Sequence, residues 1–223
     1  MEFGKSSFCT IFAKLINNKK ILIIDFDILN SSINSIFNVK KFPKKINENN
    51  YKNNINNLII NINKNIDLLC ATHILVNEDH KELKNHFINY LQELKNKYDL
   101  IIIDNSSECF FKYTKQLLNN SDLIIFLVEP NLIELKKSRN LLNIYINNWK
   151  IKKEKINIVL NKTNKNSIYD GILKTLFSDF NILGKIKINI SYNLIINKSI
   201  KHINKNIKKD YEKIIEKLNI KNK

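Results

Sequence analysis

The sequence alternates short runs of apolar residues with longer segments of helical period, and this alternation limits the possible folds more than any other feature. Within the runs, Ile, Leu and Val occupy consecutive positions instead of alternate ones. Such runs are typical of strands that are buried on both faces of a parallel sheet. Six strands are therefore predicted, at Ile21–Asp25, Ile66–Cys70, Leu100–Asp104, Leu123–Val128, Ile156–Asn161 and Ile182–Ile186.

Segments with the length of crossover helices separate these runs. Helices are predicted at Ser6–Asn17, His80–Lys97, Phe110–Asn119, Leu132–Asn148 and Ser167–Phe177, with a short helix around Ile55–Ile60. The alternation predicts an α/β fold, with a doubly wound, mostly parallel sheet flanked by helices. The 223 residues suit a single domain over residues 1–223. Only three glycines are present, so asparagine is expected to fill left-handed turn positions.

Residues 200–223 form a predicted C-terminal helix that is basic and amphipathic. Apolar residues at positions 203, 207, 211, 214, 215 and 218 make one stripe, and lysines cover the opposite face. Packing on the sheet explains the stripe, and a helix lying on a membrane is the alternative. No run of 18 apolar residues occurs and no signal peptide is evident. The expected location is the cytoplasm, with peripheral contact at the inner membrane face as the alternative.

The formal net charge of +16 raises the question of nucleic-acid binding. Of the 37 basic residues, Arg139 is the only arginine. Arginine is the residue favoured for bidentate contacts to bases, so the composition argues against a sequence-specific nucleic-acid reader. Weak non-specific contact with DNA or an acidic membrane stays open, beside the simpler interpretation of a solvated lysine surface.

The cysteines and histidines predict neither a disulfide framework nor a metal cluster. Cys9, Cys70 and Cys109 are odd in number and far apart, as expected for reduced thiols, and the first two lie among apolar residues. His73, His80 and His86 lack a convincing ligand spacing, so ordinary surface or core histidines are predicted.

Gly4-Lys5-Ser6-Ser7 stands at the start of the first predicted helix and matches the second half of a phosphate-binding loop. The full pattern is Gly-x-x-x-x-Gly-Lys-Ser/Thr, in which Gly lets the backbone approach phosphate, Lys neutralises it and Ser or Thr binds Mg²⁺. The first glycine of the pattern and its strand would fall before residue 1. The sequence leaves two explanations: a true start upstream of Met1, which we favour, or a shortened chain that kept the fold.

Three carboxylates follow predicted strands at the edge where such sheets bind ligands. Asp25 and Asp27 end the segment that begins at Lys20, and Asp104 ends the segment that begins at Tyr98. Each could cap a helix. Together, downstream of Gly-Lys-Ser, they predict a site for a metal and an attacking water.

With these motifs in this order, the chain resembles the MinD/ParA group of deviant Walker ATPases, and most closely the CpaE/TadZ-like members. The resemblance runs from Phe3 to about Ser199. It rests on Gly4–Ser7, Asp25–Ser32, Tyr98–Asp104, Ser121–Asn131, Ile158–Lys162 and Ile182–Ile186.

The resemblance implies roles for individual residues. Gly4, Lys5 and Ser7 would hold the phosphates of ATP, and Ser6 would bind Mg²⁺. Asp104 would be the Walker B carboxylate, which reaches the metal through water.

Further roles follow from the same resemblance. Asp27 would position the attacking water, with Asp25 nearby at the metal. Asn161 would contact the adenine, with Lys162 beside it at the nucleotide. Family members form homodimers around ATP and use hydrolysis to reset a partner interaction.

Three functions remain open from the sequence. The first is an ATPase that acts as a nucleotide-dependent spatial or assembly switch for pilus, secretion or cell-positioning machinery. The second is a catalytically inactive scaffold, which the incomplete loop favours. The third is a partition ATPase of the ParA type that binds DNA without sequence preference.

Overall fold

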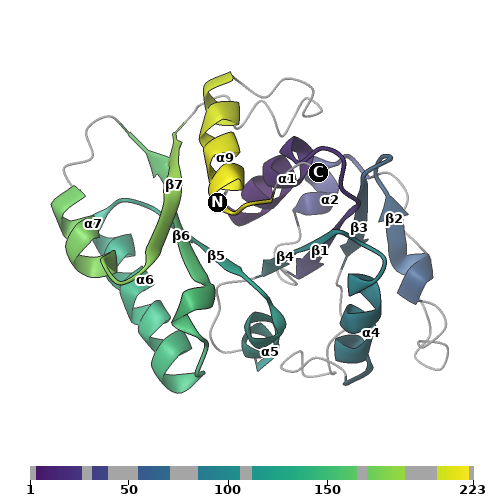
Figure 1. Ribbon diagram of the computed structural model, residues 1–223, viewed down its shortest axis with the longest axis horizontal. Coiled ribbons are helices and arrows are strands. Elements are labelled where there is room, and N and C mark those ends of the chain that lie inside the picture. Colours follow the sequence, from purple (N-terminus) through teal and green to yellow (C-terminus); the bar gives the residue numbers. More distant parts are fainter. Residues whose placement is uncertain are drawn as a thin grey trace. The chain divides into compact units, whose positions relative to one another are not determined.

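The computed structural model describes residues 4–26, 32–39, 55–70, 85–105, 112–164, 170–188 and 205–220 (Figure 1). The chain divides into two compact units. The first comprises Met1–Thr114 with Ile196–Lys201 and Asn222–Lys223, and the second comprises Lys115–Ile195 and His202–Lys221. That the 223 residues act as a single domain stays a prediction.

The first unit is built on a four-stranded sheet. Its strands are β1 (Ile21–Phe26), β2 (Ile59–Asn61), β3 (Ile66–Cys70) and β4 (Leu100–Asn105), in the order β2-β3-β1-β4. β3, β1 and β4 are parallel, and β2 pairs antiparallel with β3. All six residues of the central strand β1 are buried, including Asp25, and its four consecutive apolar residues Ile21–Ile24 predict such burial.

Helices cover both faces of this sheet. α1 (Lys5–Leu15) and α2 (Ile33–Ile36) lie on one face, and α4 (Asn85–Lys95) lies on the other (Figure 1). Successive strand residues point to opposite faces. The Phe26 ring accordingly packs against Phe87 of α4 and against Tyr113 of α5 (Lys112–Asn120), at centroid distances of 5.6 Å in both cases. The preceding residue, Asp25, is thereby turned towards the α1 face.

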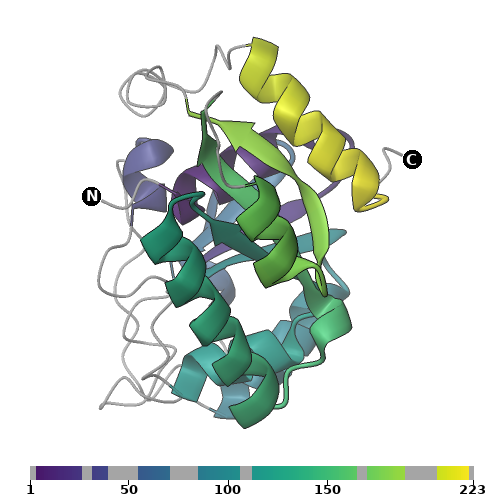
Figure 2. The ribbon, with the colours of Figure 1, turned by 90° about the vertical axis from the view of Figure 1, so that its left-hand side faces the viewer.

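The second unit is built on three parallel strands. They are β5 (Ile124–Val128), β6 (Ile156–Thr163) and β7 (Asn181–Lys187), in that order. α6 (Leu132–Asn143), which continues as a π-helical turn over Ile144–Asn148, and α7 (Asp170–Phe177) cover one face, while α9 (Lys205–Lys217) lies on the other (Figure 2). A short 3₁₀ helix, Lys153–Lys155, leads into β6.

The C-terminal helix packs on the sheet of the second unit, as the apolar stripe predicts. Ile207, Tyr211, Ile214 and Ile215 of α9 are buried, and the helix lies against β7. The approach is close at Gly184, where an added Cβ would meet Ile214 Cγ1 at 2.9 Å. The apolar face of α9 is therefore already covered by its own unit, and Lys205, Lys208, Lys209 and Lys213 are exposed.

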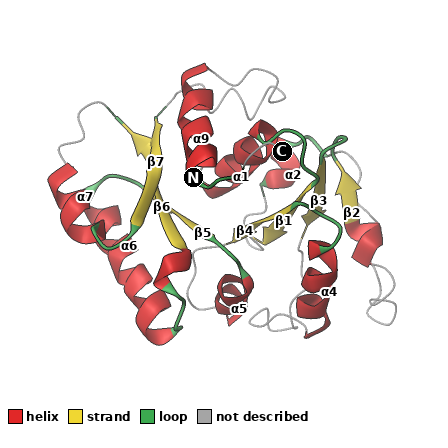
Figure 3. Ribbon diagram, viewed as in Figure 1, coloured by secondary structure: helices red, strands yellow, loops and turns green. Residues whose placement is uncertain are grey.

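The six predicted strands are confirmed, with ends that differ by at most two residues (Figure 3). The predicted helices are confirmed, but α1 and α4 each end two residues before the predicted end, at Leu15 and Lys95. Residues 80–84, 110–111 and 167–169 lie outside the described residues.

The short helix predicted at Ile55–Ile60 is wrong in its second half. A 3₁₀ helix spans Ile55–Leu58, and Ile59 then begins β2. Ile59 and Ile60 pair with Leu69 and Leu68 of β3, so tertiary pairing overrides the weak local pattern of a three-residue strand.

Asparagines occupy left-handed turn positions, as the scarcity of glycine predicts. Asn18, Asn38 and Asn219 have φ values of 63°, 53° and 52°. Two lysines, Lys150 and Lys162, adopt the same region at 59° and 56°, which is uncommon for a long side chain.

Candidate nucleotide site

Two buried carboxylates stand side by side at the carboxyl edge of the first sheet. Asp25 of β1 and Asp104 of β4 are directly opposite one another in the parallel register. Their exposed fractions are only 2% and 1%. A buried carboxylate is unfavourable without compensating charge or hydrogen bonds, and two of them side by side increase that penalty, so this edge of the sheet favours a cation.

The start of α1 meets this pair of carboxylates. The Ser6 hydroxyl donates a hydrogen bond to Asp104 Oδ2. Thr10 Oγ1 in turn donates to the Ser6 carbonyl oxygen at 2.6 Å, which fixes the first turn. Gly4 caps the helix with its backbone, since its carbonyl accepts the Phe8 N–H at 3.0 Å. The Gly-Lys-Ser segment and the Walker B-like carboxylate, 98 residues apart in sequence, are thus in contact.

Ser7 adds a buried hydroxyl at the same helix start. Its residue is 4% exposed, and its Oγ has no hydrogen-bond partner among the described residues. Most buried hydroxyls are hydrogen-bonded. No acidic residue occupies the first turn of α1, so the positive end of the helix dipole is available to an anion.

Asp25 has a structural contact as well. Its Oδ2 accepts the Ile33 N–H at 3.3 Å, at the first residue of α2. The helix-capping role that each carboxylate could have is therefore present at Asp25. Asp27, predicted to position the attacking water, lies outside the described residues.

Two thiols that the sequence suggested only as core residues adjoin these charges. Burial raises the pKa of Cys9 well above its ordinary value, the Asp104 and Asp25 carboxylates raise it further, and Lys5 lowers it. The Cys9 thiol therefore senses the charges of Asp25, Asp104 and Lys5.

Cys70, the last residue of β3, is opposite Asp25 in the register. Burial and the Asp25 charge raise the pKa of Cys70 to about 12, while its hydrogen bond to Asn34 opposes the shift. Position at the end of a predicted strand was the signal that could have placed Cys70 at this edge.

The residues at this edge suit Mg²⁺. The ion prefers hard oxygen ligands and is held by one or two carboxylates together with substrate phosphates. Ser6 Oγ and the Asp104 carboxylate supply such oxygens in direct contact. In the described part of the chain, no group of three or more His, Cys, Asp or Glu residues could hold a metal by itself, so phosphate oxygens and water would complete the coordination.

The two remaining predicted site residues lie in the second unit, at the end of β6. Asn161 is 7% exposed. Lys162 forms an ion pair with Glu129, which directly follows β5. Glu129 was not predicted as a site residue, because nothing in the local sequence indicates that it meets Lys162.

The sequence matches the AAA domain family over residues 4–160, well over half of the chain. The chain belongs to this family. Among curated proteins, no match is found.

Solved structures give this AAA domain protein the fold of MinD/ParA-type P-loop ATPases. A protein described as a plasmid partition protein of Borrelia burgdorferi B31, bound to AMPPNP, is 25% identical with a TM-score of 0.71, covering 96% of this chain and 92% of its own. MinD in the MinC:MinD complex of Aquifex aeolicus is 13% identical with a TM-score of 0.75, covering 99% and 92%. MinD of Pyrococcus horikoshii with Mg-ADP is 14% identical with a TM-score of 0.70, covering 96% and 88%.

These likenesses confirm the predicted fold class and the resemblance to the MinD/ParA group. They do not test the closer resemblance to CpaE/TadZ-like members. Among the described helices of this AAA domain protein, none is both long and apolar enough to cross a membrane.

Proposed function

We propose that this chain binds Mg²⁺-ATP and acts as an ATPase whose nucleotide state switches its interaction with a protein partner. The hydrogen bond between Ser6 and Asp104 supports this most strongly, because it joins the two halves of a magnesium site at a helix start. Nucleotide binding also agrees with the AMPPNP and Mg-ADP that accompany two of the similar structures.

Each side chain at the site has a chemical role in this proposal. Lys5 offsets phosphate charge, and the backbone N–H groups from Gly4 to Ser7 contact phosphate oxygens at the positive end of α1. The Ser6 hydroxyl, which donates to Asp104 in this structure, would hold the metal through its oxygen, and Asp104 would accept hydrogen bonds from the metal's water shell. Bound Mg²⁺ would supply charge stabilisation to the transferring phosphoryl group.

The remaining steps of hydrolysis are assigned from the family resemblance. Asp27 orients the attacking water, and Asp25 supports the metal side of the site. Asn161 and Lys162 contribute at the adenine. We further propose a homodimer in the ATP-bound state, acting in the cytoplasm on pilus, secretion or cell-positioning machinery.

Plasmid or chromosome partition is a second candidate function. Two similar structures of Borrelia burgdorferi, at 25% and 26% identity, are described as plasmid partition proteins. The lysines of α9, including Lys205, Lys208, Lys209 and Lys213, are exposed while its apolar face is covered. Such a surface suits weak, salt-dependent contact with DNA, and binding to random duplex DNA that falls steeply with salt would favour this candidate.

The first candidate is tested by measuring ATP turnover by this chain and by an extended version. The extension adds, before Gly4, an apolar strand and the first half of the phosphate loop. The edge of β4 could accept that strand, since Leu100–Ile103 are only partly buried although all four are apolar. We expect turnover and ATP-dependent dimers in the extended version. Turnover in neither version would favour the inactive scaffold.

Replacing Ser7 with Ala should separate stability from binding. Because the Ser7 hydroxyl is buried without a described partner, its removal should stabilise the ligand-free protein by about 1 kcal/mol. The affinity for Mg²⁺-ATP should fall by roughly threefold to tenfold, since a phosphate oxygen loses a donor. Urea unfolding and calorimetric titration measure the two effects. A loss of stability, or an unchanged affinity, would contradict the assignment of Ser7 to the phosphate site.

A further inference from the structure

The carboxyl end of β6 departs from regular strand geometry. Leu160 pairs with Lys185 and Thr163 pairs with Lys187, so Asn161 and Lys162 together oppose a single residue of β7. Lys162 adopts a φ of 56°, in the left-handed region where side chains other than glycine and asparagine are strained. Such bulges redirect side chains and are enriched beside binding sites.

An ion pair holds the bulge from the neighbouring strand. Lys162 Nζ pairs with Glu129 Oε1, and the two side chains are 33% and 40% exposed. On the β7 side, Thr163 Oγ1 donates to the Ile186 carbonyl at 3.2 Å. A strained residue persists only where its surroundings fix it, and these contacts fix both ends of the bulge.

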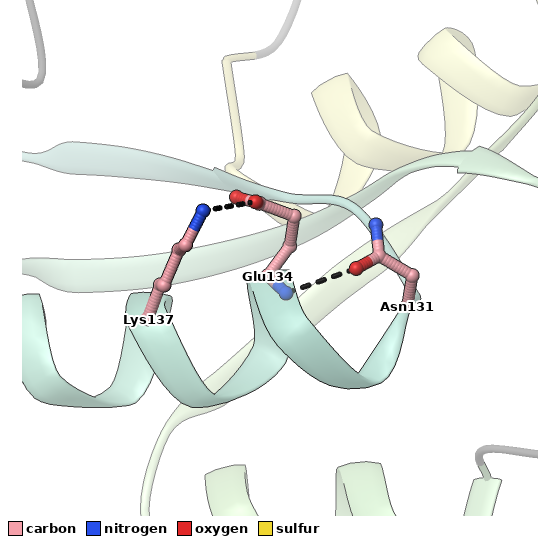
Figure 4. Close-up of polar contacts among 3 residues, drawn as sticks. All are labelled: Asn131, Glu134 and Lys137. Atoms are coloured by element: carbon pink, nitrogen blue, oxygen red, sulfur yellow. Dashed lines mark hydrogen bonds and ion pairs between the residues drawn. The ribbon is translucent and has the colours of Figure 1, made fainter.

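Glu129 is itself held in place by the start of α6. The Asn131 N–H donates to the Glu129 carbonyl at 2.9 Å, and Pro130 between them restricts φ. The Asn131 side chain caps α6 by accepting the Glu134 N–H at 2.9 Å, and Glu134 accepts a hydrogen bond from Lys137 at 3.0 Å (Figure 4). Glu129 therefore meets Lys162 from an ordered turn.

The residue that the bulge presents is Asn161. The residue is 7% exposed, and its side-chain amide has no hydrogen-bond partner within the described ranges. Its amide is therefore available to a ligand. An amide offers one acceptor and one donor, which match N6–H and N7 of adenine, whereas guanine presents two acceptors, O6 and N7.

We propose that the Glu129–Lys162 ion pair is a positioning device, which fixes the bulge so that the Asn161 amide favours adenine over guanine. This inference rests on the proposed nucleotide binding. Glu129 acts only through the bulge and need not touch the base.

The test compares Glu129→Gln with Glu134→Gln in the full chain. Glu134→Gln is the matched control. Glu134 lies on α6, five residues after Glu129, and its replacement breaks an exposed ion pair with Lys137. Dissociation constants are measured for ATP, GTP and inorganic tripolyphosphate in the presence of Mg²⁺. In Glu129→Gln, ATP affinity and the preference for ATP over GTP should each fall by roughly fivefold, as for loss of one partly exposed ion pair. Tripolyphosphate binding should stay unchanged, and Glu134→Gln should match the unsubstituted chain.

A second variant, Lys162→Asn, removes the charge while keeping a residue that tolerates the left-handed conformation. It should show the same loss of adenine preference, with faster amide hydrogen exchange at residues 160–163. An unchanged ratio of ATP to GTP affinity in both variants would overturn the positioning role alone. Absence of ATP binding by the unsubstituted chain would instead overturn the proposed function, and the inference with it.

Discussion

Replacing Asp104 with Asn should lower the affinity for Mg²⁺-ATP by about 10-fold to about 100-fold, the range seen when a group that orients a metal's ligands is lost. Asp104 is 1% exposed, is opposite Asp25 in the sheet and accepts the Ser6 hydroxyl. Asparagine keeps the shape and one acceptor oxygen, so the variant should fold. Calorimetric titration of ATP with and without Mg²⁺ measures the effect, and the loss should be confined to the titration with Mg²⁺.

Asp67→Asn is the matched control, because Asp67 is also a strand carboxylate of the first unit. Its two oxygens accept the Tyr98 hydroxyl at 2.9 Å and the Asn61 amide at 2.8 Å. Its replacement should lower the free energy of unfolding by about 1–2 kcal/mol, as for a lost hydrogen bond to a charged group. Nucleotide affinity should not change. Equal losses of Mg²⁺-ATP binding in both variants would show that Asp104 acts only through stability.

Replacing Gly184 with Val should lower the free energy of unfolding by about 2–3 kcal/mol, since overpacking a tight contact has this effect. A Cβ at Gly184 would lie 2.9 Å from Ile214 Cγ1 and 3.5 Å from Cδ1, so the Ile214 side chain or α9 must move away from β7. Urea unfolding measures the change. In the background of Ile214→Ala the same substitution should be much less damaging, because the clashing atoms are gone.

Gly171→Ala provides the control for removing a glycine. No atom lies within 4 Å of a Cβ added at Gly171, near the start of α7, so the change should stabilise the protein by about 0.5 kcal/mol. If Gly184→Val did not lower the free energy of unfolding, α9 would not pack on β7 as closely as described.

Most of the fold could be predicted because several of its strands carry Ile, Leu and Val at consecutive positions. β1 and β4 read as buried parallel strands, and their shared carboxyl edge predicted that Asp25 and Asp104 would be neighbours, as the register confirms. Chain order also predicted that the helix expected from Ser6 to Asn17 would bring Ser6 to that edge, where it contacts Asp104. Strand ends and helix starts are local features, and the crossover rules bring them together.

The features that escaped prediction depend on tertiary contacts. β2 is only three residues long and exists through its pairing with β3. The bulge at Asn161 and Lys162 interrupts the regular pairing of β6 with β7. Its left-handed residue is a lysine, where glycine or asparagine would be expected. Glu129 meets Lys162 across 33 residues of sequence, and no local pattern indicates such a pair.

A crystal structure of the chain grown with Mg²⁺ and AMPPNP tests the central claim most directly. It should show Mg²⁺ about 2.1 Å from Ser6 Oγ, with Asp104 reaching the ion through water and Lys5 at the phosphates. A nucleotide bound elsewhere, or a Ser6 hydroxyl that stays on Asp104 with no metal beside it, would contradict the account.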